Sequence, residues 1–355
     1  MQKKIRYILL PFSFLYEGII SIRNKLFDRN FFRSATFDIP LICIGNLSLG
    51  GTGKTPMVEY LVKMLRGKYK VATLSRGYKR KTKGFFIANE NSKTSDIGDE
   101  PMQLYKKFSG ITVAVDEDRV MGIPKILNDK PETEIIILDD AFQHRQVAAG
   151  LNILLTEYNH LYTNDYLLPA GNLRDSKVSS KRADIIIVTK CKSNLNEDEK
   201  KALIKELNPL QKQKIYFTKI KYETPYHLFT KEKYTIRPET LVFLICGIAN
   251  PQKIEEEIIS KGASHKMLRF NDHHVYNSTD VKKINEEFSK IDSPTKIILT
   301  TEKDASRLLK FGNDLKSLPL FVLPMSHEFL FDESSEFEKS ILEFVESYDS
   351  IKKGF

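Results

Sequence analysis

The sequence predicts an α/β protein built on a parallel sheet with helices on both faces. From Asp38 onward, short apolar runs alternate with amphipathic stretches of helical length, and this alternation is typical of repeated βαβ units. The first apolar run ends in a glycine-rich turn that leads into a helix, all within residues 41–56. A turn of this kind places backbone N–H groups at a helix N-terminus, where they can bind an anion. Ligands are therefore expected at the carboxyl ends of the strands.

The elements of the first unit follow in order along the chain. We expect strands at residues 39–45, 70–75, 111–115, 134–139, 151–156 and 184–189, and helices near 54–66, 99–108 and 117–128. Residues 191–214 are charged and helical in pattern. Residues 214–236 are extended and rich in Lys and Tyr, which favours connecting strands.

A second alternation follows the connecting strands. It begins with a strand at 241–247, continues with helices near 250–261 and 278–290 and a strand at 296–300, and is closed by a helix near 334–347. We therefore predict an N-terminal segment (1–35), a phosphate-binding domain (36–213), a β-ribbon linker (214–236) and a smaller α/β domain (237–355). A chain of 355 residues is long enough for two such domains.

Charge and cysteine content narrow the class of protein. Lys and Arg total 55 against 46 Asp and Glu, a net charge of +9, which suits acidic partners such as nucleotides, anionic lipid or nucleic acid. The three cysteines are too few and too scattered for a disulfide framework or a zinc site.

The N-terminal segment is basic and rich in aromatic residues. Residues 1–33 hold seven Lys and Arg against two Asp and Glu, a local balance of +5. Their unbroken apolar part is about half of the ~20 residues that a membrane-spanning helix needs. No small-residue cleavage site follows, which argues against a signal peptide. An amphipathic segment at an anionic membrane interface is predicted, with a helix docked on the core as the alternative.

The glycine-rich turn has the chemistry of a nucleotide-phosphate cradle. Its glycines let several N–H groups point at one anion, Lys54 adds a mobile positive charge, and the Thr55 hydroxyl can hold Mg²⁺. The strict pattern G-x-x-x-x-G-K-[ST] fails because Ser48 stands where its first glycine belongs. We predict a variant cradle for a nucleoside triphosphate formed by Asn46, Gly50, Gly51, Thr52, Gly53, Lys54 and Thr55.

Polar residues follow two other predicted strands. The apolar run 135–138 ends in Asp139 and Asp140, the expected place for a carboxylate that holds Mg²⁺ directly or through water. Asp139 is the better candidate because it ends the strand. The strand at 71–75 leads into Arg76 and a basic loop, which could bind a substrate phosphate or remain a solvated loop.

Two further positions favour proton transfer. Asp99 and Glu100 stand at a predicted helix start, where they could cap the helix or where Asp99 could accept the proton of an attacking hydroxyl. In Asp272-His273-His274, neighbouring side chains on an extended chain point to opposite sides, and no third metal ligand is evident. A proton-handling histidine is therefore expected here rather than a metal site.

Seven motifs occur in a fixed order: Gly-Asn-x-x-x-Gly-Gly-Thr-Gly-Lys-Thr-Pro (45–56), Leu-Ser-Arg-Gly-Tyr (74–78), Gly-Asp-Glu-Pro (98–101), Asp-Asp-x-x-Gln-His-Arg (139–145), Leu-Pro-Ala-Gly-x-Leu-Arg (168–174), Phe-x-Asp-His-His (270–274) and Thr-Thr-Glu-Lys-Asp-Ala (300–305). Together they resemble the tetraacyldisaccharide 4'-kinase family of the lipid A pathway in Gram-negative bacteria, within the P-loop NTPase superfamily. The resemblance extends from the N-terminal segment to beyond residue 305.

The resemblance implies that ATP with Mg²⁺ phosphorylates the 4'-hydroxyl of a tetraacylated glucosamine disaccharide 1-phosphate, which gives lipid IVA. It implies two α/β domains hinged by a β-ribbon, in a peripheral protein at the cytoplasmic face of the inner membrane, which we expect to be monomeric. Lys54 would be catalytic, Thr55 and Asp139 would serve the metal, and Asp99 with His273 would form a proton relay. The sequence does not separate His273 from its neighbour His274. Substrate binding is assigned to Arg76, Glu100, Gln143, His144 and Arg174.

Two other function classes compete with this one. A membrane-associated P-loop ATPase switch would also use a glycine-rich cradle, but it would release only free phosphate. A nucleic-acid-binding NTPase is suggested by charge alone, and no recognition motif accompanies the basic balance, so no nucleic-acid partner is expected.

Overall fold

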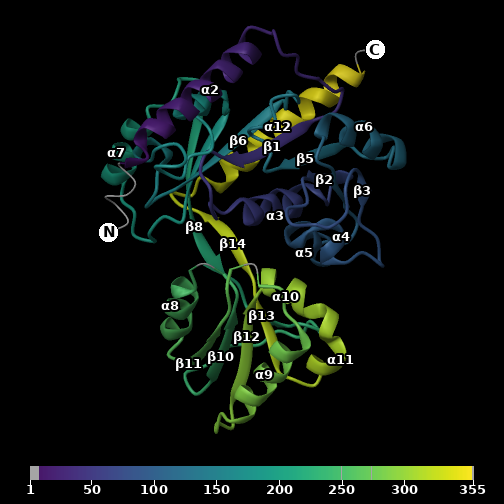
Figure 1. Ribbon diagram of the computed structural model, residues 1–355, viewed down its shortest axis with the longest axis vertical. Coiled ribbons are helices and arrows are strands. Elements are labelled where there is room, and N and C mark those ends of the chain that lie inside the picture. The colour runs from purple at the N-terminus through teal and green to yellow at the C-terminus, as the bar shows by residue number, and fades with distance from the viewer. Residues whose placement is uncertain (1–7, 249, 273, 354–355) are drawn as a thin grey trace.

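The structure is a computed structural model that describes residues 8–248, 250–272 and 274–353 (Figure 1). Its larger domain is built on a nine-stranded sheet with the order β14-β8-β7-β6-β1-β5-β2-β4-β3. The strands are β1 (Leu41–Asn46), β2 (Val71–Ser75), β3 (Phe86–Ile87), β4 (Thr112–Val115), β5 (Ile135–Asp139), β6 (Leu151–Glu157), β7 (Ile185–Thr189), β8 (Lys214–Tyr222) and β14 (Met325–Phe329). Neighbouring strands from β8 to β4 are parallel, whereas β3 and β14 pair antiparallel at the two edges.

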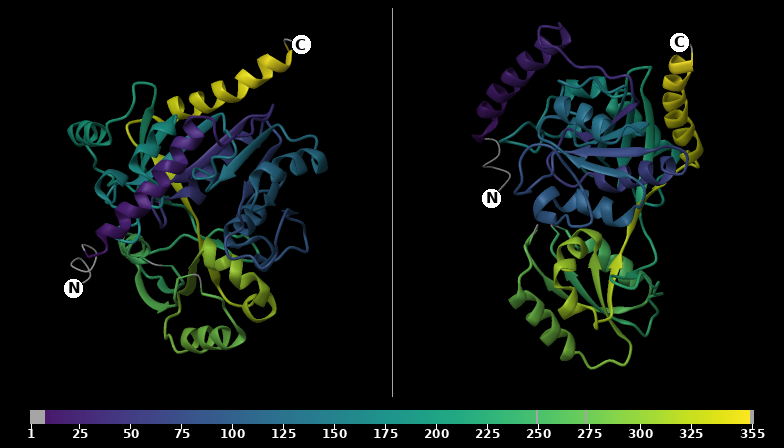
Figure 2. Two further views of the ribbon diagram at one scale, coloured as in Figure 1. Left: turned by 45° about the horizontal axis from the view of Figure 1, so that its top comes forward. Right: turned by 90° about the vertical axis from the view of Figure 1, so that its right-hand side faces the viewer.

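Helices cover both faces of this sheet, as the apolar strand runs require. Successive residues of β1 alternate between the faces: Leu41 and Cys43 join one core, and Ile42 and Ile44 join the other. The first core is covered by α2 (Leu10–Asp28), α6 (Arg119–Asp129) and α7 (Glu197–Leu207). The second is covered by α3 (Lys54–Leu65), α5 (Asp99–Lys107) and α12 (Ser334–Lys353), with the short α4 (Thr94–Ile97) before α5. Figure 2 shows α2 and α12 on opposite sides of the larger domain.

The smaller domain has a five-stranded sheet of its own with the order β11-β10-β12-β13-β9. Its elements are β9 (Tyr226–His227), β10 (Leu241–Cys246), α8 (Gln252–Ser260), β11 (Ser264–Arg269), α9 (Ser278–Ser289), β12 (Lys296–Thr301), α10 (Glu302–Leu308), α11 (Gly312–Leu315) and β13 (Leu320–Leu323). All its strand pairs are parallel except β13 with β9. The α/β fold class predicted from the sequence is confirmed.

Two antiparallel strands, β8 and β14, run between the domains (Figure 1). β14 carries the chain back to the larger domain, where α12 packs on the sheet. Phe337 of α12 is fully buried against Tyr216 and Phe329, with ring centroids 5.4 and 4.7 Å away. The prediction that residues 237–355 belong to the smaller domain is therefore wrong for their last part. The apolar face of a helix is visible in a sequence, but the sheet that it covers is not.

The N-terminal helix α2 lies on the larger domain through one face. Ser13, Ile20 and Phe27, spaced by seven residues, are buried there. Phe12, Leu15, Ile19 and Ile22 form a stripe on another face, and each is at least 60% exposed. Among the described residues, none of the helices has the length and apolar character that a bilayer span requires.

Candidate active site

The carboxyl ends of β1, β5 and β2 meet at one edge of the large sheet, because these strands are parallel neighbours. The glycine-rich turn, the acidic pair at 139–140 and the basic loop after β2 therefore lie along one rim. This is the edge at which open α/β sheets bind ligands.

The turn between β1 and α3 has the backbone shape of a phosphate cradle. Gly50 and Gly53 adopt φ values of 111° and 87°, a left-handed region that disfavours any side chain. The Thr52 carbonyl accepts a bond of 2.8 Å from the Thr189 hydroxyl, and the Gly53 carbonyl lies 2.9 Å from Nε2 of His327. In a trans peptide the following N–H points opposite to the carbonyl. The amides of Gly53 and Lys54 are thereby directed away from these two anchors.

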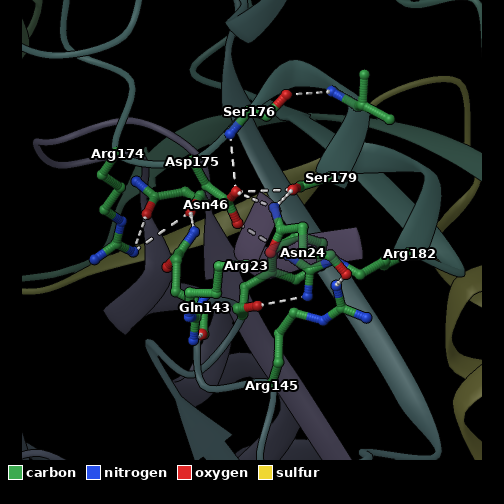
Figure 3. A network of polar contacts seen from close by, with 12 residues as sticks. Arg23, Asn24, Asn46, Gln143, Arg145, Arg174, Asp175, Ser176, Ser179 and Arg182 are labelled. Atoms are coloured by element: carbon green, nitrogen blue, oxygen red, sulfur yellow. Dashed lines mark hydrogen bonds and ion pairs between the residues drawn. The ribbon is translucent and has the colours of Figure 1, made fainter. Parts of the chain in front are cut away.

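Asn46, at the end of β1, connects the parts of the cradle, and Figure 3 shows its contact with Arg174. It is fully buried, and its amide nitrogen lies 3.0 Å from the Thr52 hydroxyl. Its Oδ1 accepts bonds from Lys54 Nζ at 3.3 Å and from Arg174 at 2.6 Å. The Gln143 side chain donates to the Asn46 main-chain carbonyl at 2.9 Å. Lys54 is thus held at the cradle by side chains of the protein itself.

The two acids at the end of β5 have different environments. Asp140 is held by Arg174 through both of its oxygens, and Lys54 Nζ lies 3.8 Å from its Oδ1. Burial alone would raise the pKa of Asp140, but the hydrogen bonds from Arg174 and the charge of Lys54 outweigh it and lower this pKa. Asp140 is therefore already neutralised by two cations of the protein.

Asp139 is in the opposite situation. Its side chain is buried, and its Oδ1 has no hydrogen-bond partner among the described residues. Burial, together with the charges of Glu100 and Asp140, raises the pKa of Asp139 to about 7. A buried carboxylate without a partner is costly unless a cation neutralises it. Asp139 therefore fits a Mg²⁺ ion, and Thr55, half-buried at the first turn of α3, stays its predicted companion.

The protein alone does not surround such an ion. In the described parts of the chain, no group of three or more His, Cys, Asp and Glu side chains could hold a metal. Mg²⁺ usually binds one or two carboxylates and completes its shell with water and substrate phosphates. A site of this kind depends on a bound nucleotide.

The start of α5 lies beside the basic loop that follows β2, since Gly98 is in close contact with Gly77 and Tyr78. Gly98, with φ of 95°, turns the chain so that Asp99 and Glu100 occupy the first turn of the helix. Together with Tyr78 and Pro101 they line a small cleft. Nε and Nη2 of Arg307, which comes from α10 of the smaller domain, lie 2.9 and 2.5 Å from Asp99 Oδ2. The candidate base therefore lies at the contact between the domains.

Of the two neighbouring histidines, His274 has a role within the smaller domain. Its Nε2 lies 2.9 Å from Asp280 Oδ2, and its ring stacks on Phe270 at 4.7 Å. His273, the predicted partner of Asp99, lies outside the described residues, so its role stays a prediction.

The residues predicted to bind substrate separate into two groups. Gln143 and Arg174 contact Asn46 and so lie at the phosphate end of the site. Arg76 is exposed after β2, Glu100 lines the small cleft, and His144 is half-buried, with no partner for its Nε2 in the described structure. Burial and the charge of Arg119 lower the pKa of His144.

Sequence reasoning missed two buried residues of the site. Arg119 begins α6, and burial lowers its pKa although the charges of Asp139 and Asp140 oppose this shift. Arg119 follows the end of β4 by four residues, and a position near the carboxyl end of a parallel strand is a sequence feature that indicates a place at the ligand-binding edge. Nε2 of His327, on β14, donates to the Gly53 carbonyl at 2.9 Å, and its Nδ1 lies 2.9 Å from Thr218 Oγ1. It stands alone in its sequence segment, so no pattern indicated it.

A family model described as tetraacyldisaccharide-1-P 4'-kinase matches residues 5–346. The chain belongs to this family. A curated tetraacyldisaccharide 4'-kinase of Flavobacterium psychrophilum is 45% identical over 97% of this chain and 98% of its own length. One of Bacteroides thetaiotaomicron is 42% identical over 96% and 94%. Membership makes the protein a kinase and confirms the family resemblance drawn from the seven motifs.

A solved structure supports the same conclusion. The crystal structure of LpxK from Aquifex aeolicus in complex with ATP matches this chain with a TM-score of 0.76 and 30% identity, over 96% of this chain and 99% of that one. The family and the fold therefore agree with a nucleotide site at the cradle. The roles of single residues remain predictions from their geometry.

The two acids should differ in metal dependence. Asp139→Asn is expected to raise the Mg²⁺ concentration for half-maximal phosphoryl transfer by about tenfold or more, because it removes the buried carboxylate that needs a cation. Asp140→Asn should lower the rate without this increase, since Asp140 is held by Arg174 and Lys54. Mg²⁺ titrations at saturating ATP measure both. Equal shifts in the two variants would contradict the assignment.

His327 should make stability depend on pH. Burial lowers its pKa to about 4, so between pH 4 and 6.5 the unfolded chain binds a proton that the folded chain does not, and stability falls as the pH falls through this window. From pH 7 to pH 5 the wild type should lose about 2 kcal/mol more unfolding free energy than His327→Gln. Denaturant unfolding at several pH values measures the difference. If the unfolding free energies of the wild type and of His327→Gln changed equally with pH, His327 would not be a neutral buried residue.

Proposed function

We propose that this protein is an ATP-dependent kinase that phosphorylates the 4'-hydroxyl of tetraacyldisaccharide 1-phosphate, which gives lipid IVA. The observation that carries the proposal is the single rim on which the phosphate cradle, the buried Asp139 with its unpaired Oδ1 and the acid pair of α5 lie together. Membership of the tetraacyldisaccharide-1-P 4'-kinase family supports the substrate class.

The donor side would be formed by the cradle. The amides of Gly53 and Lys54 would hold the phosphates of ATP. Lys54 Nζ would stabilise the negative charge on the γ-phosphate in the transition state. Asp139 and Thr55 would hold Mg²⁺, which neutralises phosphate charge when it is bound. Arg174 would remain paired with Asp140 when Lys54 turns to the nucleotide. The Asp140 carboxylate would therefore stay neutralised, and the movement of Lys54 would cost little free energy.

The acceptor side would be formed by α5 and the basic rim. Asp99 would accept the proton of the attacking hydroxyl, with His273 as its partner in a relay. Arg76 and the buried Arg119 place positive charge near this end; both act on the pKa of His144 and are therefore close to it. Such charge suits the 1-phosphate of the acceptor.

The helix α2 would hold the protein on the membrane that contains this lipid. Its exposed apolar stripe, Phe12, Leu15, Ile19 and Ile22, has no cover in the described structure, and a stripe of this kind favours burial in a lipid interface. The helix is also tied to the site, because Arg23 Nη2 donates to the Gln143 carbonyl at 3.0 Å (Figure 3). We therefore propose peripheral attachment of a monomer at the cytoplasmic face of the inner membrane.

The proposed activity is tested by following labelled γ-phosphate. Incubation with ATP and tetraacyldisaccharide 1-phosphate in detergent should place the label in the lipid. Lys54→Ala should raise the barrier by several kcal/mol and so lower the rate well over tenfold. A membrane-associated ATPase switch would release only free phosphate, and that result would refute the kinase proposal. A folded Lys54→Ala variant with more than about a tenth of the wild-type rate would refute the role of Lys54.

The membrane role of α2 predicts a specific loss of binding. A triple variant, Phe12→Ser, Leu15→Ser and Ile19→Ser, should bind vesicles of phosphatidylethanolamine and phosphatidylglycerol less well, because it removes apolar area that the lipid would cover. The matched control changes three exposed apolar residues elsewhere, Met121, Ile259 and Val275, to Ser. Co-sedimentation measures both. Equal binding by the two variants would leave α2 as a helix of the fold only.

A further inference from the structure

The motif Thr-Thr-Glu-Lys-Asp-Ala at 300–305 has no part in the function proposed so far. It covers the end of β12 and the start of α10, and α10 packs against α5 of the larger domain (Figure 1). Two ion pairs cross between these helices. One of them reaches Asp99, the candidate base.

The contact on Asp99 is a two-pronged one. Arg307 places Nε at 2.9 Å and Nη2 at 2.5 Å from the same oxygen, Asp99 Oδ2. The Arg307 side chain is 6% exposed and that of Asp99 is 20% exposed, so solvent screens the pair little. A planar guanidinium that donates two bonds also fixes the direction of its acceptor.

Arg307 is itself held rigidly from within the smaller domain. Its Nη1 lies 3.1 Å from Oδ1 of Asp304, which is fully buried. Asp304 Oδ2 in turn accepts bonds of 2.9 Å from the Gly247 amide and from the Thr301 hydroxyl. The acid of the motif thus anchors Arg307 to the ends of β10 and β12. Through Arg307, the position of the Asp99 carboxylate therefore depends on the core of the smaller domain.

The second ion pair between the helices does not involve the base. Lys107, at the other end of α5, places Nζ at 2.5 Å from Glu302 Oε1 and at 2.6 Å from Glu59 Oε2. It joins the same two domains through the same two helices. Lys107 therefore provides a matched control that separates domain contact from the placement of Asp99.

We propose that Arg307 is a positioning residue that orients the Asp99 carboxylate across the domain contact. The inference rests on the proposed role of Asp99 in accepting the proton of the acceptor hydroxyl. It gives the 300–305 motif a purpose: Asp304 fixes Arg307, and Arg307 fixes Asp99. The base is correctly placed only while α10 lies on α5, which ties proton transfer to domain contact.

The test compares steady-state kinetics of the wild type and five full-length variants, which are Arg307→Gln, Arg307→Lys, Lys107→Gln, Asp99→Ala and the double variant. Arg307→Gln should lower kcat by about 10²-fold, the usual effect of a misplaced catalytic group, and should leave the KM for ATP near that of the wild type. Arg307→Lys, which keeps the charge and loses the fork, should recover part of kcat. Lys107→Gln should retain most of its turnover. Asp99→Ala combined with Arg307→Gln should be no slower than Asp99→Ala alone.

Thermal unfolding of each variant shows that it is folded. Equal losses of kcat in Lys107→Gln and Arg307→Gln would overturn the inference, because they would reduce Arg307 to a domain clamp. Multiplicative defects in the double variant would overturn it as well. A slow Asp99→Ala with normal turnover in Arg307→Gln would overturn this inference alone, whereas full turnover in Asp99→Ala would overturn the proposed role of Asp99 with it.

Discussion

Asn46 ends the central strand with no exposed surface, and its side chain holds Thr52, Lys54 and Arg174 at once. A buried amide is stable only when its donors and acceptors are satisfied, so this residue and the cradle specify each other. The carbonyls of Thr52 and Gly53 accept hydrogen bonds from Thr189 and His327, on the side away from the amides that form the cradle. The cradle is therefore shaped by the protein, and a nucleotide would not have to order it.

The charges of the rim follow from this arrangement. Asp140 is matched by Arg174 and Lys54, which leaves Asp139 as the buried acid that needs an external cation. One strand of the interdomain ribbon, β14, carries His327 to the cradle. Across the domain contact, Arg307 reaches Asp99. The acceptor side thus depends on the smaller domain, and the donor side depends on the edge strand through which the chain returns from it.

The parts of the fold and of the site that depend on neighbouring residues could be predicted from the sequence. The apolar run 135–138 identified β5 and its terminal acids, and the glycines at 50–53 identified the cradle, because strand burial and turn geometry depend on neighbouring residues. The rest depends on contacts distant in the sequence. The strand β14, the large-domain packing of α12 and the contact of His327 with Gly53 each join segments more than a hundred residues apart. A single sequence shows which face of a segment is apolar, but it does not show the partner.

We infer that contacts within the protein, rather than the nucleotide, give the phosphate cradle its shape. A crystal structure with Mg²⁺ and a non-hydrolysable ATP analogue, compared with one without ligand, tests it most directly. We expect the contacts of Asn46 with Thr52 and Arg174 to persist in both, while Lys54 turns to the phosphates and Asp139 faces the ion. A cradle that refolds around the analogue, or an Arg174 that leaves Asn46 and Asp140, would contradict this explanation of the site.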